Sequence, residues 1–318
     1  MMTCDVPDDG ERIEAARRLG HDVFQHSYLK PSLAWDTFVL EGFRSAAALR
    51  IARHNGDRFV RKWLQLRASA LRRQRIVDEQ VTPAFLRQID VVECPVLRRP
   101  LTHAEHGDWD WSVDRLNNDG AYAPRNLAII STCANRAKSN HSFGDIHARA
   151  SLSHDVDGLS PVHWMRMAAL MVGPCFVEAP ASAPVLPLLA PLPLATVRSA
   201  TQMIQYVITL HARSAADKNL LIKQFTRLCS NSHARAHASK VIELIHLSLK
   251  TTPVAWDVWA NERVMQTFLA WRASLPGYVW AAIGETAVAL AGARKVHRQA
   301  VDAWHLHAGG RFGENWRR

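Results

Sequence analysis

The chain has 318 residues, of which 48% are hydrophobic and 21% charged, a globular balance that excludes wholesale disorder. Five cysteines without paired Cys-x-x-Cys spacing exclude a disulfide scaffold and favour a reducing compartment. Lys and Arg total 39 against 29 Asp and Glu, so the net charge is +10 and a polyanionic partner is favoured.

The termini and the apolar stretches predict a cytoplasmic protein without a membrane segment. The N-terminus is acidic and lacks the apolar core of a signal peptide. The longest mostly apolar stretch, 167–197, contains Glu178 and six prolines, which a membrane helix would not tolerate. The apolar run 279–293 has only 15 residues and includes Glu285, so it predicts a buried helix.

The segment 44–75 holds nearly the whole net charge, because it contains ten basic residues and one acid, Asp57. Its apolar residues recur at helical spacing, and Asn55-Gly56 divides it into two helices. We predict a basic amphipathic hairpin between about Trp35 and Glu79. Two interpretations stay open: a solvated helical face, or a surface that faces phosphates.

A new element opens at Thr82-Pro83, and the apolar run 89–92 is compatible with a strand. Further along, two β-like runs at 111–113 and 127–130 flank a segment rich in turn-forming residues, Asn117-Asn118-Asp119-Gly120. Residues 132–139 follow with a helical pattern. The sequence therefore predicts strand, long loop, strand and helix over 111–140.

The Pro-, Ala- and Leu-rich stretch at about 177–194 favours an extended linker. Residues 198–318 have helical periodicity and six tryptophans, which we expect to lie in a core. We predict an α+β class: a mostly helical chain with a small embedded ββα core and a helical C-terminal domain. The expected domains are 1–89 (basic, helical), 90–145 (core), 146–197 (connector) and 198–318 (helical).

The window of about 90–142 contains several motifs in a fixed order. They are Cys94-Pro95-Val96-Leu97, Asp114-Arg115-Leu116-Asn117-Asn118, Asn126-Leu127 and Asn135-Arg136-Ala137-Lys138-Ser139. This window resembles the HNH, or ββα-metal, nuclease family, in its Asp-Arg form. The resemblance implies a metal-dependent endonuclease that acts on DNA, with Mg²⁺ or Mn²⁺ held by hard oxygen ligands.

Site residues follow from position in the motif. Asp114 and Asn135 stand where the family keeps its metal ligands, and Asn126 is expected to hold the loop through side-chain to backbone hydrogen bonds. The predicted catalytic set is Asp114, Arg115, Asn126, His103 and His106. The predicted nucleic-acid contacts are Arg72, Arg73, Arg136 and Lys138.

One position departs from the family pattern. Arg115 replaces the histidine that serves as general base, and a guanidinium cannot accept a proton at neutral pH. Arg115 could instead bind a phosphate, and His103 or His106 could supply the base or simply be exposed loop residues. Cys94 and Cys133 each stand alone, so we do not expect a structural zinc.

Three readings are therefore open. The first is a metal-dependent endonuclease, with the basic helices gripping nucleic acid. The second is an HNH-like fold that binds nucleic acid without cutting it. The third is a protein-interaction platform built on the C-terminal helices, and it predicts a metal position blocked by side chains. The oligomeric state is left open.

Overall fold

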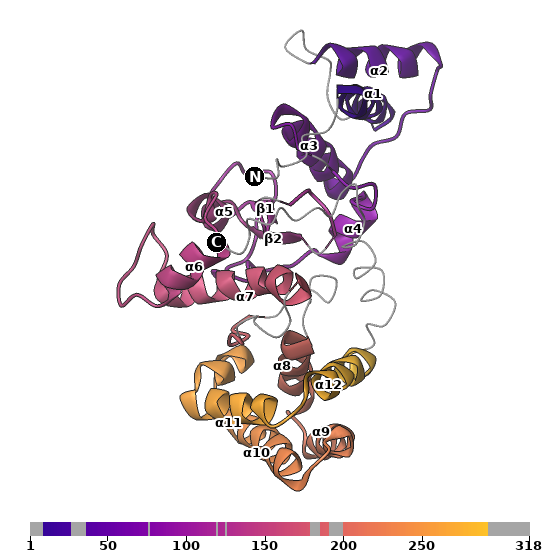
Figure 1. Ribbon diagram of the computed structural model, residues 1–318. Coiled ribbons are helices and arrows are strands. Elements are labelled where there is room, and N and C mark those ends of the chain that lie inside the picture. Colours follow the sequence, from indigo (N-terminus) through magenta and orange to yellow (C-terminus); the bar gives the residue numbers. More distant parts are fainter. Residues whose placement is uncertain are drawn as a thin grey trace.

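The computed structural model describes residues 9–26, 36–75, 77–118, 120–124, 126–178, 185–190 and 200–291. Over these residues the chain is mostly helical with one small two-stranded antiparallel sheet, which is the α+β class expected. The helices form an N-terminal group, a central unit around the sheet and a C-terminal group (Figure 1). No helix in these ranges combines the length and apolarity needed to span a membrane.

The N-terminal group is built on a close helix crossing between α1 (Asp9–Gln25) and α2 (Thr37–Ala48). A Cβ atom on Gly20 would lie 1.9 Å from the backbone oxygen of Val39, so only glycine permits this approach. The two predicted basic helices do form, but the predicted hairpin is wrong. Helix α2 packs against α1, whereas α3 (Arg58–Arg72) packs against α1 and α4.

Helix α3 connects the N-terminal group to the central unit. Asp57 caps its first turn, because the carboxylate accepts hydrogen bonds from the backbone N–H groups of Phe59 and Val60, both at 2.9 Å. Leu64 faces the N-terminal group, while Phe59 and Leu66 face the central core.

Helix α4 (Pro83–Gln88) begins at Thr82, whose side chain accepts from Phe85 N. The run 89–92 that follows is irregular, so the strand considered there is wrong. Ile89 is fully buried where it ends α4, which explains why the run is apolar without being a strand.

The predicted strand–loop–strand–helix is confirmed. Strands β1 (Trp111–Arg115) and β2 (Leu127–Ser131) are antiparallel, with Asp114 opposite Ala128. Helix α5 (Thr132–Lys138) follows β2 without a loop, because the Ser131 side chain caps it by accepting from Ala134 N at 3.2 Å. β2 is buried along its whole length, so the sheet lies inside the central unit.

Part of the expected connector is helical. Helices α6 (Phe143–Ala150) and α7 (Pro161–Glu178) occupy much of it, and Trp164 and Met167 of α7 are fully buried. Residues 185–190 of the Pro-rich stretch contribute Leu188 and Leu189 to the core. The other parts of that stretch, 179–184 and 191–194, lie outside the described residues.

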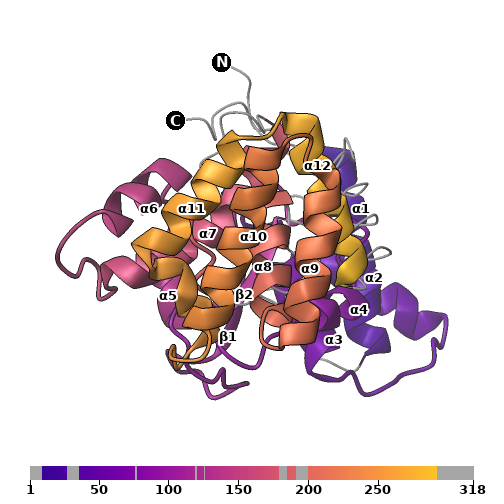
Figure 2. The same ribbon diagram turned by 90° about the horizontal axis from the view of Figure 1, so that it is seen from below.

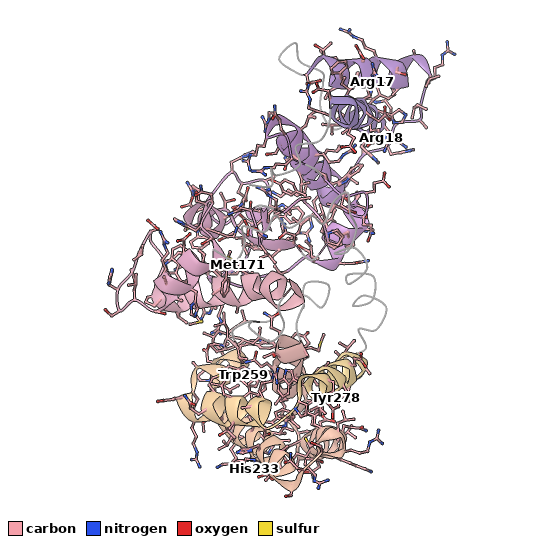
Figure 3. All side chains as sticks on the ribbon, viewed as in Figure 1. Arg17, Arg18, Met171, His233, Trp259 and Tyr278 are labelled. Carbon is pink, nitrogen blue, oxygen red and sulfur yellow. The ribbon has the colours of Figure 1, made fainter. Side chains whose placement is uncertain are left out.

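The C-terminal group is a set of helices that lie side by side (Figure 2). Its core is aromatic, because the rings of Trp259, Trp271 and Trp280 each pack against Phe268, and Trp259 is labelled in Figure 3. Trp256, Trp259, Trp271 and Trp280 are buried, as expected of core residues, whereas Trp304 and Trp316 lie outside the described residues. A guanidinium–carboxylate pair between Arg98 and Asp257, with N–O distances of 2.6 and 2.9 Å, joins this group to the central unit. The elements are α8 (Ala200–His211), α9 (Ala215–Leu228), α10 (Ser232–Ser248), the 3-10 helix η2 (Ala255–Ala260), α11 (Glu262–Ala273) and α12 (Gly277–Leu290).

Candidate functional site

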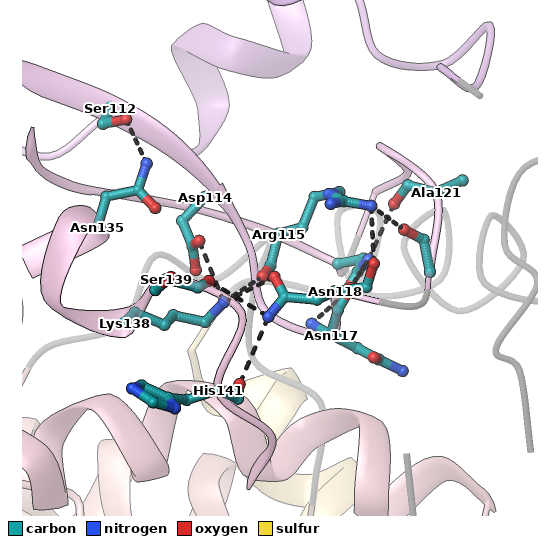
Figure 4. Close-up of polar contacts among 12 residues, drawn as sticks. Ser112, Asp114, Arg115, Asn117, Asn118, Ala121, Asn135, Lys138, Ser139 and His141 are labelled. Atoms are coloured by element: carbon teal, nitrogen blue, oxygen red, sulfur yellow. Dashed lines mark hydrogen bonds and ion pairs between the residues drawn. The ribbon is translucent and has the colours of Figure 1, made fainter. Parts of the chain in front are cut away.

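Strand β1 and helix α5 bring the two predicted metal ligands to one face. Ser112 and Asp114 are two residues apart on the strand, so their side chains share a face. Asn135 and Lys138 are three apart on the helix and share the facing side. The amide of Asn135 donates to Ser112 Oγ at 2.7 Å, and Lys138 Nζ donates to Asp114 Oδ1 at 3.2 Å (Figure 4).

Lys138 lies inside this face rather than on the surface. Its side chain is 0% exposed, and its ammonium group contacts three oxygens. They are Asp114 Oδ1 at 3.2 Å, the backbone oxygen of Arg115 at 2.7 Å and Asn118 Oδ1 at 3.2 Å. An ammonium has three N–H donors, so all of them are used. The predicted contact of Lys138 with phosphate is therefore wrong, since the group cannot reach solvent.

Asp114 is equally enclosed, with only 4% of its surface exposed. Its Oδ2 atom is buried and accepts no hydrogen bond from any described residue. Burial raises the pKa of this carboxyl, and the neighbouring Lys138 and Arg115 charges oppose that rise. In the Asp114–Lys138 pair, Asp114 Oδ2 is therefore the atom that is suited to bind a cation.

Electrostatics decides whether a divalent ion fits here. Two unit charges about 4 Å apart interact by ~4 kcal/mol at an effective dielectric constant of about 20. A divalent ion would therefore gain about 8 kcal/mol from Asp114 and lose about as much to Lys138. Mg²⁺ also keeps several waters, for which this buried pair leaves no room. The side chains present do not fit a resident divalent ion in this arrangement.

Further acidic or sulfur ligands that would complete a metal site at Asp114 are also not found together in the described part of the chain. Within the described part of the chain, no three His, Cys, Asp or Glu side chains gather as a metal-binding group. Cys94 is buried, and its sulfur accepts from Ser131 N at 3.3 Å. Among the described residues, Asp114 therefore has no cluster of His, Cys, Asp or Glu side chains to complete a metal site.

Asn126 makes the side-chain to backbone hydrogen bonds expected of it. Its oxygen accepts from Asn117 N at 2.8 Å, and its amide donates to the backbone oxygens of Asn117 and Ala121, both at 2.9 Å. The side chain is 1% exposed. These bonds use both of its N–H donors and tie the loop between the strands to the start of β2, which is a positioning role.

Arg115 supports the same loop from the other side. It follows Asp114 directly on β1, so its side chain leaves the opposite face of the strand. Its Nη1 donates to the backbone oxygens of Asn118 at 2.8 Å and Gly120 at 3.0 Å. Burial lowers the pKa of Arg115, and the nearby charges of Arg75 and Arg73 lower it further. The side chain therefore leaves β1 on the face opposite to Asp114, although the two charges still interact, since the Asp114 charge raises the pKa of Arg115.

The two predicted histidines are not brought to Asp114. The His103 ring lies 5.2 Å from that of Trp111, and its Nε2 accepts from Arg58. Trp111 begins β1, roughly 10 Å along the strand from Asp114. Burial, and then the Arg58 charge, lower the pKa of His103. His106 is exposed, and its backbone N–H donates to Asp110 Oδ2 at 2.9 Å, so it shapes the loop 102–110.

The basic helix α3 is anchored to the central unit at Trp111, the first residue of β1, and at Val81. Lys62 Nζ donates to the backbone oxygen of Trp111 at 2.6 Å, and Trp63 Nε1 donates to that of Val81 at 2.7 Å. Burial lowers the pKa of Lys62. The exposed arginines Arg61, Arg72 and Arg73 make no ion pair with any described residue, unlike others of the segment. Their charge is therefore free to meet an external anion.

Arg136 is the remaining predicted contact residue. It is exposed on α5 and forms an ion pair with Asp108. Sequence patterns did not identify Lys62, which anchors α3, or Asn118, which accepts from Lys138. Asn118 lies in the turn-forming run and in the motif that begins at Asp114, and neither position indicates that its side chain accepts from Lys138.

Comparison with known proteins adds no independent assignment. No family model, curated protein or solved structure matches the chain. The likeness to the HNH family thus remains an expectation drawn from the motif, and any function has to be argued from the site itself.

Proposed function

We propose that this protein binds nucleic acid, with DNA as the expected partner, through the exposed face of α3. The observation that carries the proposal is the set of exposed arginines on α3, which have no acidic partner among the described residues. Helix α3 is anchored through Lys62 to Trp111 at the start of β1 and through Trp63 to Val81. Phe59 and Leu66 of α3 belong to the same buried core as residues of β1 and β2, so the basic helix packs on the unit that contains the HNH-like motif.

Arg73, Arg75 and Arg115 supply a second argument for an anion. Arg73 caps the end of α3 and Arg75 follows it, and the charges of both lower the pKa of Arg115, although burial is the larger cause. A phosphate between these like charges would relieve their mutual repulsion and form charge-assisted hydrogen bonds with them. The contacts would be to backbone phosphates, which give affinity without sequence readout.

The β1–β2–α5 elements act in this proposal as a scaffold. Asp114 and Lys138 form an internal ion pair, while Asn126 and Arg115 fix the loop beside the end of α3. These groups can hold α3 and the loop in a defined arrangement without taking part in cleavage.

Fluorescence anisotropy with labelled duplex DNA at low salt tests the proposal. The variant Arg72→Glu/Arg73→Glu should bind at least tenfold more weakly, because each charge reversal replaces a phosphate contact with repulsion. Arg235→Glu is the matched control, since Arg235 is an exposed arginine on α10 in the C-terminal group. Equal binding by all three proteins would mean that the basic face of α3 is only solvated and does not bind nucleic acid. Parallel titrations with single-stranded DNA and RNA establish the preferred nucleic acid.

Metal-dependent cleavage is the second candidate, and one observation favours it: the buried Asp114 Oδ2 has no partner among the described residues. It requires Lys138 to leave the carboxylate. A plasmid-nicking assay with Mg²⁺ and Mn²⁺ tests it. Nicking that Asp114→Ala abolishes would establish this candidate, and identical plasmid patterns with and without the protein would remove it.

A further inference from the structure

The ammonium group of Lys138 lies among oxygens of the kinds that hard metal ions take. One belongs to a carboxylate, one to a backbone carbonyl and one to a side-chain amide. All three come from the end of β1 and the loop after it, while the lysine comes from α5. The ammonium thus connects the helix to the strand and to the loop at one point (Figure 4).

Full burial makes this contact unusual. Lysine is almost never fully buried unless it is paired, because an isolated charge loses its hydration. Here the charge of Asp114 neutralises it, and three hydrogen bonds replace its water. Asn135, one turn earlier, is occupied with Ser112, so Lys138 is the helix residue that reaches Asp114.

We propose that the Lys138 ammonium is the resident cation of the ββα core, in the place where the family resemblance implies a divalent metal ion. The core therefore holds its loop without metal, and Asp114 serves as the counter-charge of a lysine. The role of Lys138 in the core and nucleic-acid binding by α3 are independent, so either one can be refuted while the other stands.

The first test uses the natural sequence. Titration with Mn²⁺, followed by electron paramagnetic resonance of the free ion, should give the same curve for the unaltered protein and for Asp114→Asn. The melting temperature of the unaltered protein should not change on addition of EDTA or Mn²⁺. Submillimolar Mn²⁺ binding that Asp114→Asn removes would overturn the proposal.

The second test removes the ammonium. Lys138→Ala leaves space for an ion with water beside Asp114, Arg115 O and Asn118, so this variant should melt at a lower temperature. Mn²⁺ should then raise its melting temperature by roughly 2–4 °C or more, through binding to the folded state. Arg136→Ala, an exposed basic residue of the same helix, is the control and should show no Mn²⁺ response. A Lys138→Ala protein that gains nothing from Mn²⁺, folded or not, contradicts the proposal.

Discussion

Replacement of Lys138 by methionine isolates the charge of the buried pair, because methionine keeps most of the volume of lysine and leaves little cavity. Asp114 is then left buried without its counter-charge, and the oxygens of Arg115 and Asn118 each lose a donor. Removal of one partner from a buried ion pair costs ~3–5 kcal/mol. That is a large part of the ~5–15 kcal/mol that stabilises a typical domain.

The loss should be measured locally, because a chain with separate helical groups need not unfold in one step. Hydrogen exchange of peptides covering 111–118 and 132–139 reports on the core itself. In a double-mutant cycle with Asp114→Val, the pair should show a coupling of roughly 1.5–3 kcal/mol, because the double variant buries no charge. Additive effects, or unchanged exchange in Lys138→Met, would refute the buried pair.

Three further outcomes follow from particular contacts. Asp57→Ala should destabilise α3 by about 0.5–2 kcal/mol through loss of its cap. The hydrogen bond from the backbone N–H of Val60 is the main cause that lowers the pKa of Asp57 below its ordinary value of 3.8. The stabilisation by the cap is therefore fully present above that ordinary value and is lost as the pH falls through the lower folded-state pKa. Circular dichroism between neutral and acid pH can follow this loss, and helix content that does not change with pH contradicts it. Asn126→Ala should cost about 1–3 kcal/mol for each buried backbone group left unpaired, measured by urea unfolding, and a loss below ~1 kcal/mol would argue against the loop bonds. Arg115→His should give no gain in nicking with Mn²⁺, because this side chain points away from Asp114; an increase that Asp114→Ala abolishes would reverse that conclusion.

The parts of the fold that sequence predicted are those set by local patterns. Strands β1 and β2 show short β-like runs around a turn-forming loop, and Ser131 gives α5 a cap directly after β2. The tryptophans of the C-terminal group are apolar enough to mark a core. Each of these signals lies within a few residues of the element that it specifies.

The failures depend on contacts between distant residues. An apolar run such as 89–92 fits a strand or the end of a helix, and the burial of Ile89 decides between them. The partner of α2 is set by the glycine contact with α1 rather than by its charge. A lysine in a basic motif predicts a phosphate contact, and only the positions of Asp114 and Asn118 reveal that Lys138 turns inward.

The salt dependence of DNA binding is the sharpest test of nucleic-acid binding through α3. The logarithm of the binding constant falls with the logarithm of salt concentration by about 0.9 per phosphate neutralised on duplex DNA. Neutralising two exposed arginines of α3, in Arg61→Gln/Arg72→Gln, should therefore reduce the slope by roughly 2 relative to the unaltered protein. A slope that stays the same in this double variant would contradict nucleic-acid binding through α3.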